Sequence, residues 1–348
     1  MRVWQIAAGR SGRDYRSLFF AHDVMVMGPS WYGSAMETDY SEGTGATLGN
    51  QIESFATGPA PGDRVIMRLG QSITGVGEIP RGESNQYSFD DSFRTVYGWD
   101  LRHTRRVKWA PPNRLGPLKH MSFKAIQQPT FTKVRNSRIV AAASSMPARV
   151  FDRPLKKKPA TNSSTYTEEE LGEELFRAGI GSRNTTDIYA ALRQADNLCS
   201  WYQEDGSGQR PTEHEVVSHI VLPLFLGLGW SHQQMAVEWN NIDVAFFART
   251  PTREENCVMV LEAKGMGQGL DDVLNQPTRY VERHGLRRVR YIVVTNGQVF
   301  MVHARSHGSW ASSPIAFLDV SCLQKQYVLP KGTTPVKTLV MLQPSSFR

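Results

Sequence analysis

Three charged side chains, Asp243, Glu262 and Lys264, stand at the ends of two apolar segments in the second half of the chain. Because alternate residues of an extended strand share a face, Glu262 and Lys264 are expected side by side. Charges among apolar strands are unfavourable unless a partner compensates them. A divalent cation bound by Asp243 and Glu262, with Lys264 beside it, supplies that compensation. Hard oxygen ligands favour Mg²⁺, with Mn²⁺ as a substitute.

The segments around these residues predict a mixed α/β core. Hydrophobic periodicity predicts elements in the order α-β-β-β-α-β-β, over residues 212–225, 235–239, 242–248, 257–263, 270–284, 289–295 and 299–304. Asn240 and Asn241 accept positive φ, which predicts a tight hairpin between the first two strands. The third strand is almost wholly apolar, as is typical of a buried central strand.

This ordered pattern resembles the PD-(D/E)xK nuclease superfamily, and more narrowly the nuclease domain at the N-terminus of type I restriction motor subunits. The resemblance covers about residues 210–305 and depends on EHEVVSHIVLPLFLGLGW, IDVAFF, VMVLEAK, QPTRY and VVTNGQVFMVHA. It implies an α/β restriction-endonuclease-like core, a mixed sheet flanked by helices, that hydrolyses phosphodiester bonds with Mg²⁺. Ile242 replaces the family's usual proline before the first acidic residue, at a position that varies in the superfamily.

The resemblance also implies roles for individual residues. Asp243 and Glu262 bind the metal, together with the backbone carbonyl of Ala263. Lys264 orients or helps to activate the attacking water and offsets charge on the transition state. Gln276 either positions Lys264, contacts the nucleic-acid backbone, or only caps a helix face.

A helical acid often completes such sites, and two glutamates compete for this place. Glu213 shares a helical face with apolar residues that point inward, which favours it over Glu215. The alternative role of Glu213 is to stabilise the helix dipole. Glu238 is either a further acid near the metal or an exposed strand residue. Glu262 and Lys264 also have an alternative role, as a structural ion pair at a strand end.

Charge is unevenly distributed along the chain. Residues 1–160 carry 23 Lys and Arg against 13 Asp and Glu, and the remainder carries 17 against 20. The basic first half favours a polyanionic partner such as a phosphate backbone. Short strands and turns over residues 1–140 predict a β-rich barrel domain, and the composition of residues 141–166 predicts a linker. Residues 167–348 are expected to hold a helical brace followed by the nuclease domain.

The N-terminal segments VWQIAAG, GDRVIMRLGQSITGVGEI and HTRRVKW resemble the PUA-like superfamily, especially its EVE-like branch, over about residues 1–110. Domains of this kind bind RNA or modified bases in DNA, and an extruded base stacks on aromatic side chains. Candidates for stacking and for phosphate contacts are Trp31, Tyr32, Tyr97, Trp99, Arg102, Arg105, Arg106 and Lys108. The alternative for each aromatic residue is a place in the barrel core.

Together these features predict a Mg²⁺-dependent endonuclease of the modification-dependent DNA restriction kind. The alternatives are an RNA-directed nuclease, a non-cleaving nucleic-acid-binding defence subunit, and an enzyme that needs a separate motor protein. One site cuts one strand, so a homodimer or an assembly on DNA is expected. A cytoplasmic location is expected because the chain shows neither a signal peptide nor an apolar run of membrane-spanning length, and its three cysteines are widely spaced.

Overall fold

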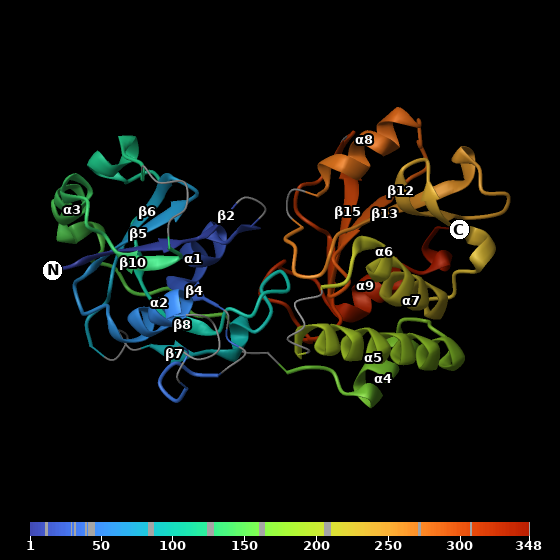
Figure 1. Cartoon of the computed structure of the whole chain (residues 1–348), viewed down its shortest axis with the longest axis horizontal. Helices are drawn as coiled ribbons and strands as arrows, with labels where there is room; N and C mark the ends of the chain where they lie inside the picture. Colours follow the sequence, from blue (N-terminus) through green and yellow to red (C-terminus); the bar gives the residue numbers. More distant parts are fainter. Residues whose placement is uncertain are drawn as a thin grey trace. The chain divides into compact units, whose positions relative to one another are not determined.

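The computed structural model describes residues 1–10, 13–28, 30, 33–38, 40, 46–82, 87–123, 129–159, 164–204, 210–270, 273–306 and 308–347. The chain divides into two compact units, residues 1–161 and residues 162–348 (Figure 1). Both units are mixed α/β. Of the helices that the structure describes, none is both long enough and apolar enough to cross a membrane.

The first unit is built on an open five-stranded sheet in the order β10-β1-β5-β6-β9. Its strands are β1 (Val3–Ala7), β5 (Arg64–Leu69), β6 (Ser72–Glu78), β9 (Lys108–Trp109) and β10 (Phe131–Lys133). The other strands are β4 (Val24–Met27), β7 (Ser88–Phe89) and β8 (His103–Arg106) in a second sheet, and the pair β2 (Gly9–Arg10) and β3 (Arg13–Asp14). The helices are α1 (Arg16–His22), α2 (Ala46–Thr57) and α3 (Ser137–Ser144).

These sheets close into no barrel among the residues described, which differs from the expected PUA-like barrel. The segment HTRRVKW, residues 103–109, forms two short strands that are separated at Val107, whose N–H donates to the carbonyl of Asp23. As a result β8 pairs with β4 in one sheet, whereas β9 pairs with β6 in the other. The chain therefore changes sheets within seven residues, a feature that the alternation of residue types does not reveal.

The first unit also extends further along the chain than the composition predicts. Residues 141–144 are the last turn of α3, and Ala143, Met146 and Phe151 are buried in the core of this unit. The linker expected over residues 141–166 therefore begins as part of a packed domain. The physical reason is that alanine is the strongest helix former and fits close packing, so this Ala-rich stretch builds a helix rather than a spacer.

The second unit is built on a seven-stranded mixed sheet. Its strands are β11 (Met235–Trp239), β12 (Ile242–Phe247), β13 (Cys257–Ala263), β14 (Tyr291–Thr295), β15 (Val299–Ser306), β16 (Ser309–Trp310) and β17 (Ala316–Asp319). Its helices are α4 (Glu168–Arg177), α5 (Ser182–Glu204), α6 (Glu213–Val216), α7 (Leu222–Gly227), α8 (Asn275–Arg283) and α9 (Pro335–Met341). The expected order α-β-β-β-α-β-β is confirmed, although α8 begins at Asn275 rather than at residue 270.

The helices of the second unit lie on two faces of its sheet. Helix α8 lies on one face, whereas α5, α7 and α9 lie on the other (Figure 1). Val244 of β12 and Leu261 of β13 belong to the core that these latter helices cover. Because side chains alternate along a strand, Asp243 and Glu262 belong to the face that carries α8.

Candidate active site

Asp243 and Glu262 occupy facing positions on two neighbouring strands. Strands β12 and β13 are antiparallel, and Val244 is paired with Leu261. The register ends at this pair, and the next residue along each strand is Asp243 on β12 and Glu262 on β13, so the two carboxyl groups share one face of the sheet. The backbone N–H of Ala263 donates to Oδ2 of Asp243 at 2.6 Å, which ties the end of β13 to the first acid.

Lys264 connects this pair of acids to the helix above the sheet edge. Its Nζ donates to Oε1 of Glu262 at 2.7 Å and lies 3.5 Å from Oε1 of Glu213, the first residue of α6. Its backbone N–H donates to the carbonyl of Thr295 on β14, which holds the residue at the end of its strand. The structure therefore brings together Asp243, Glu262, Lys264 and Glu213.

Glu215, the alternative helical acid, has a different role. Its N–H donates to Oγ1 of Thr212, and its Oε2 accepts the N–H of Thr212 at 2.7 Å, which forms a capping box. These hydrogen bonds lower the pKa of the Glu215 carboxyl. The capping box occupies Glu215 at the start of α6 and leaves Glu213 to contact Lys264.

The carboxyl group of Glu262 is buried and only half compensated. Its side chain is 1% exposed, and its Oε2 has no hydrogen-bond partner in the part of the chain that the structure describes. Burial raises the pKa of Glu262 to about 7, against the opposing effect of the hydrogen bond from Lys264. Burial likewise raises the pKa of Asp243, although the N–H of Ala263 and the charge of Lys264 oppose this. Both carboxyl groups are therefore short of positive partners.

The donor set at this edge fits a magnesium ion of the kind that retains several water ligands. No group of three or more His, Cys, Asp or Glu side chains in the described ranges is arranged to hold a metal. Mg²⁺, however, commonly binds one or two carboxylates and completes its shell with water and substrate phosphate. Asp243 and Glu262 supply two carboxylates. Oε2 of Glu262 has no hydrogen-bond partner among the described residues and is therefore available to bind the cation. The carbonyl of Ala263 faces β12, as its N–H does, because a strand residue directs both groups to the same neighbour.

Gln276 lies at the start of α8, on the same face of the sheet as the two acids. Its backbone N–H donates to the carbonyl of Val273 at 3.2 Å, and its side chain is half-buried. Among the hydrogen bonds of the described residues, none joins its side chain to Lys264. Its positioning role therefore stays a prediction.

A contact between Glu238 and His214 borders the site, and the sequence did not indicate that these two residues would meet. Glu238 lies in β11, which pairs with the strand that carries Asp243, and has a φ of 53°. Its Oε1 lies 3.4 Å from Nδ1 of His214 on α6. The charge of Glu238 also contributes to raising the pKa of Asp243. No histidine spacing in the sequence points to His214, because its partner comes from a strand more than twenty residues away.

The arginines expected to contact phosphates in the first unit are engaged within it. Arg105 is buried and donates to the carbonyls of Phe55, Ala56 and Pro59 at the end of α2, which corrects the expectation that it faces nucleic acid. Burial lowers its pKa to about 10. The guanidinium thus satisfies carbonyl groups that the end of α2 leaves without helical partners.

The neighbouring arginines are also partly committed. Arg102 pairs with Asp100 at 2.7 Å and with Asp91 at 3.3 Å, and its guanidinium lies 4.5 Å from the ring centre of Phe89. Arg106 is half-buried and donates to the carbonyl of Lys156. Each of these arginines has partners within the first unit, and its contact with a phosphate stays a prediction.

Of the four aromatic residues predicted to stack on a base, the structure describes Tyr97 and Trp99. Trp31 and Tyr32 lie outside the described residues. Tyr97 and Trp99 are half-buried in a tight turn, in which Val96 and Trp99 exchange backbone hydrogen bonds at 3.0 and 3.1 Å. Tyr97 has a φ of 52°. Stacking on a base stays a prediction for both of these aromatics.

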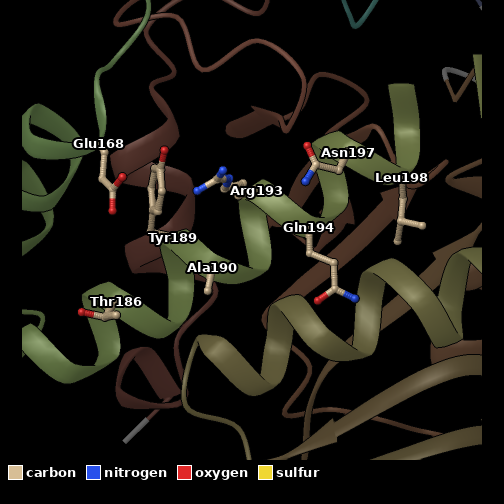
Figure 2. A pocket seen from close by; sticks show the side chains of 8 residues that line it. All are labelled: Glu168, Thr186, Tyr189, Ala190, Arg193, Gln194, Asn197 and Leu198. Carbon is tan, nitrogen blue, oxygen red and sulfur yellow. The ribbon is translucent and has the colours of Figure 1, made fainter. Parts of the chain in front are cut away.

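A cavity of about 580 Å³ lies on the surface of the second unit, at the start of α4 and along α5 (Figure 2). Its lining residues are Glu168, Thr186, Tyr189, Ala190, Arg193, Gln194, Asn197 and Leu198. None of them belongs to the acidic site, which lies at the carboxyl end of β13. The cavity therefore plays no part in the chemistry that the acids and Lys264 can perform.

Two comparisons of this chain with known proteins find no match. No protein-family model matches it, and no curated protein matches it. The geometry at the end of β13 is therefore the ground on which a function is inferred.

Proposed function

We propose that the protein is a Mg²⁺-dependent endonuclease whose second unit is a restriction-endonuclease-like core. The observation that supports this is the convergence of Asp243, Glu262 and Lys264, with Oε2 of Glu262 buried and unpaired. Leaving a buried acceptor unsatisfied costs roughly 1–3 kcal/mol, more when the group is charged. A site that keeps such an acceptor beside a second raised-pKa acid is suited to binding a cation.

The chain's own groups divide the work as follows. Asp243, Glu262 and the carbonyl of Ala263 would hold the ion, which when bound polarises the phosphate and lowers the pKa of a coordinated water. Lys264 offsets negative charge that develops on the phosphate. Burial opposes the charge of Lys264, but its hydrogen bond to Glu262 and the nearby carboxylates raise its pKa above the usual value. This favours orienting the water over removing its proton.

The first unit is proposed to bind the nucleic acid and to sense a modified base. The support within the structure comes from the half-buried aromatics Tyr97 and Trp99, which lie in a tight turn close in sequence to Arg102. Such a protein would act as a modification-dependent DNA restriction enzyme. Cutting both strands then requires a homodimer or assembly on the DNA, because each chain offers one site.

The experiment is a cleavage assay with the full chain and Mg²⁺. The substrates are genomic DNAs that differ only in cytosine modification, together with structured RNA. Glu262→Gln and Lys264→Ala are each expected to lower the cleavage rate by about 100-fold or more, as removal of transition-state stabilisation does elsewhere. Glu215→Gln is the matched control, because Glu215 caps the same helix without touching Lys264.

Two of the alternatives, and the sensing role of the first unit, each have their own outcome in this assay. Cleavage of RNA but not of DNA would identify an RNA-directed nuclease. Equal cleavage of modified and unmodified DNA would remove the sensing role and leave the nuclease. Intact substrates under every condition, with unchanged defence activity in cells that carry Lys264→Ala, would identify a non-cleaving subunit and overturn the proposal.

A further inference from the structure

Exposed arginines are concentrated on α8 and on the turn that follows it. Residues 279–290 include one acid, Glu282, and five arginines, all of them exposed: Arg279, Arg283, Arg287, Arg288 and Arg290. The last two donate to backbone carbonyls. For the first three, the described ranges contain no ion pair with an acid, although the second half of the chain has more acids than bases.

The spacing of these charges is unfavourable for the isolated protein. Arg279 and Arg283 are four residues apart on one helix, so their side chains are neighbours on its surface. Like charges in this arrangement destabilise a helix. An external anion would relieve this repulsion. The phosphates along a nucleic-acid strand form a row of negative charges that can face the row of arginines.

Helix α8 is placed to follow a strand of nucleic acid away from the acidic site. It connects the parallel strands β13 and β14, so it begins near the carboxyl end of β13 and runs back toward the start of β14. The site lies at that carboxyl end, and α8 lies on the same face of the sheet (Figure 1). The seven residues of β13 span about 23 Å. That length corresponds to roughly six or seven phosphates along one strand of a duplex.

We propose that Arg279, Arg283 and Arg287 form a phosphate-binding surface that holds double-stranded DNA beside the catalytic edge. This rests on the proposed function and deepens it, because it places non-specific substrate binding in the second unit. Arg105 of the first unit, by contrast, donates to internal carbonyls. Contacts to phosphates carry no sequence information, so this surface binds modified and unmodified DNA alike.

The test measures DNA binding separately from cleavage. Fluorescence anisotropy of a duplex of about 30 base pairs, titrated with the full chain in EDTA, gives the affinity at several salt concentrations. Arg279→Ala combined with Arg283→Ala is expected to weaken binding at least about tenfold and to reduce the salt slope by about 2. The matched control is Arg183→Ala combined with Arg193→Ala, two exposed arginines of α5 on the other face of the sheet.

The outcomes separate this surface from the catalytic proposal. Weaker binding by the α8 variant alone, on both modified and unmodified DNA, supports the surface even if the wild-type chain cuts nothing. Equal affinity of the α8 variant and the wild type would overturn it, even if the wild type cleaves DNA. An equal loss in the α5 control would show unspecific attraction, and tighter binding to duplex RNA than to DNA would contradict the stated ligand.

Discussion

Two buried carboxyl groups, one in each unit, differ in their hydrogen-bond donors and in the direction in which their pKa values are shifted. Asp63 of the first unit accepts hydrogen bonds from the N–H groups of Arg2 and Ala60 and from the indole of Trp4, at 2.7, 3.0 and 3.0 Å. Burial alone raises the pKa of Asp63, but these bonds and the charge of Arg2 hold it below its usual value. Glu262 of the second unit has one donor, and its pKa is raised to about 7.

The difference teaches how to separate a structural acid from a functional one. Both side chains are almost fully buried, so burial does not distinguish them. The number of hydrogen-bond donors distinguishes them. Asp63 accepts its hydrogen bonds within its own unit, whereas Oε2 of Glu262 has no partner among the described residues. A satisfied buried acid stabilises a fold, and an unsatisfied one is available to a ligand at a cost in stability.

The largest effect expected from this comparison is the loss of Asp63. Asp63→Asn replaces an acceptor oxygen with an NH₂ group that faces existing donors, so we expect the first unit to lose roughly 2–4 kcal/mol of unfolding free energy. Hydrogen exchange of peptides from β1 and β5 measures this unit directly. The control is Glu262→Gln, which should leave those peptides unchanged. An Asp63→Asn protein as stable as the wild type would show that the donors around this acid are unimportant.

Glu262→Gln should instead stabilise the second unit, and only at high pH. The pKa of Glu262 in the folded chain, about 7, exceeds its ordinary value of 4.5, so the folded state binds more protons between these limits. The stability that the protonated group provides is complete below about pH 4.5 and is lost as the pH rises through 7. The variant avoids this loss. We therefore expect its free energy of unfolding to exceed that of the wild type by roughly 1–3 kcal/mol at about pH 8, and to equal it near pH 4.

Chemical denaturation in EDTA at these two pH values, monitored by hydrogen exchange of β13 peptides, measures this difference in unfolding free energy. Lys264 remains paired in the variant, because the amide oxygen of glutamine still accepts its hydrogen bond. A variant that is destabilised equally at both pH values would mean that Glu262 is a structural acid like Asp63, and the contrast between the units would fail.

Much of the second unit was predictable because its signals are local. The strands over residues 235–239 and 257–263 have the predicted bounds, and Asn240 and Asn241 adopt φ values of 54° and 65° in the hairpin. The face of a helix can likewise be derived from a few neighbouring residues. Helical periodicity favours Glu213 over Glu215 for the site on this ground, and its part in catalysis stays a prediction.

What the sequence did not reveal depends on partners far along the chain. Arg105 lies in a strand-like segment, yet its role is set by α2, about fifty residues earlier. The change of sheets at Val107 and the burial of Phe151 also depend on distant elements. The pairing of His214 with Glu238 needs the helix and the hairpin to be folded first. Composition and periodicity carry no information about such pairs.

Magnesium offers a further way to sharpen the contrast between the two acids. An ion that binds only the folded state stabilises it, by about 1.4 kcal/mol at ten times its dissociation constant. We expect Mg²⁺ to raise the melting temperature of the wild type, more at pH 8 than at pH 6, because the ligands must first lose their protons. Glu262→Gln should abolish this shift, whereas Arg183→Ala should retain it. A shift of equal size in the Glu262→Gln protein would place the ion elsewhere.

The smallest expected effects come from the two glutamates of α6, and they should be opposite in kind. Glu213→Gln removes a charge 3.5 Å from Lys264, so we expect a fall of about tenfold in the cleavage rate with little change in stability. Glu215→Gln keeps the acceptor of the capping box but loses its charge at the helix start, so we expect a small loss of stability with the cleavage rate retained. Paired cleavage and denaturation measurements on both variants test this. If Glu215→Gln lowered the rate as much as Glu213→Gln, the contact between Glu213 and Lys264 would be incidental, and α6 would act only as a scaffold.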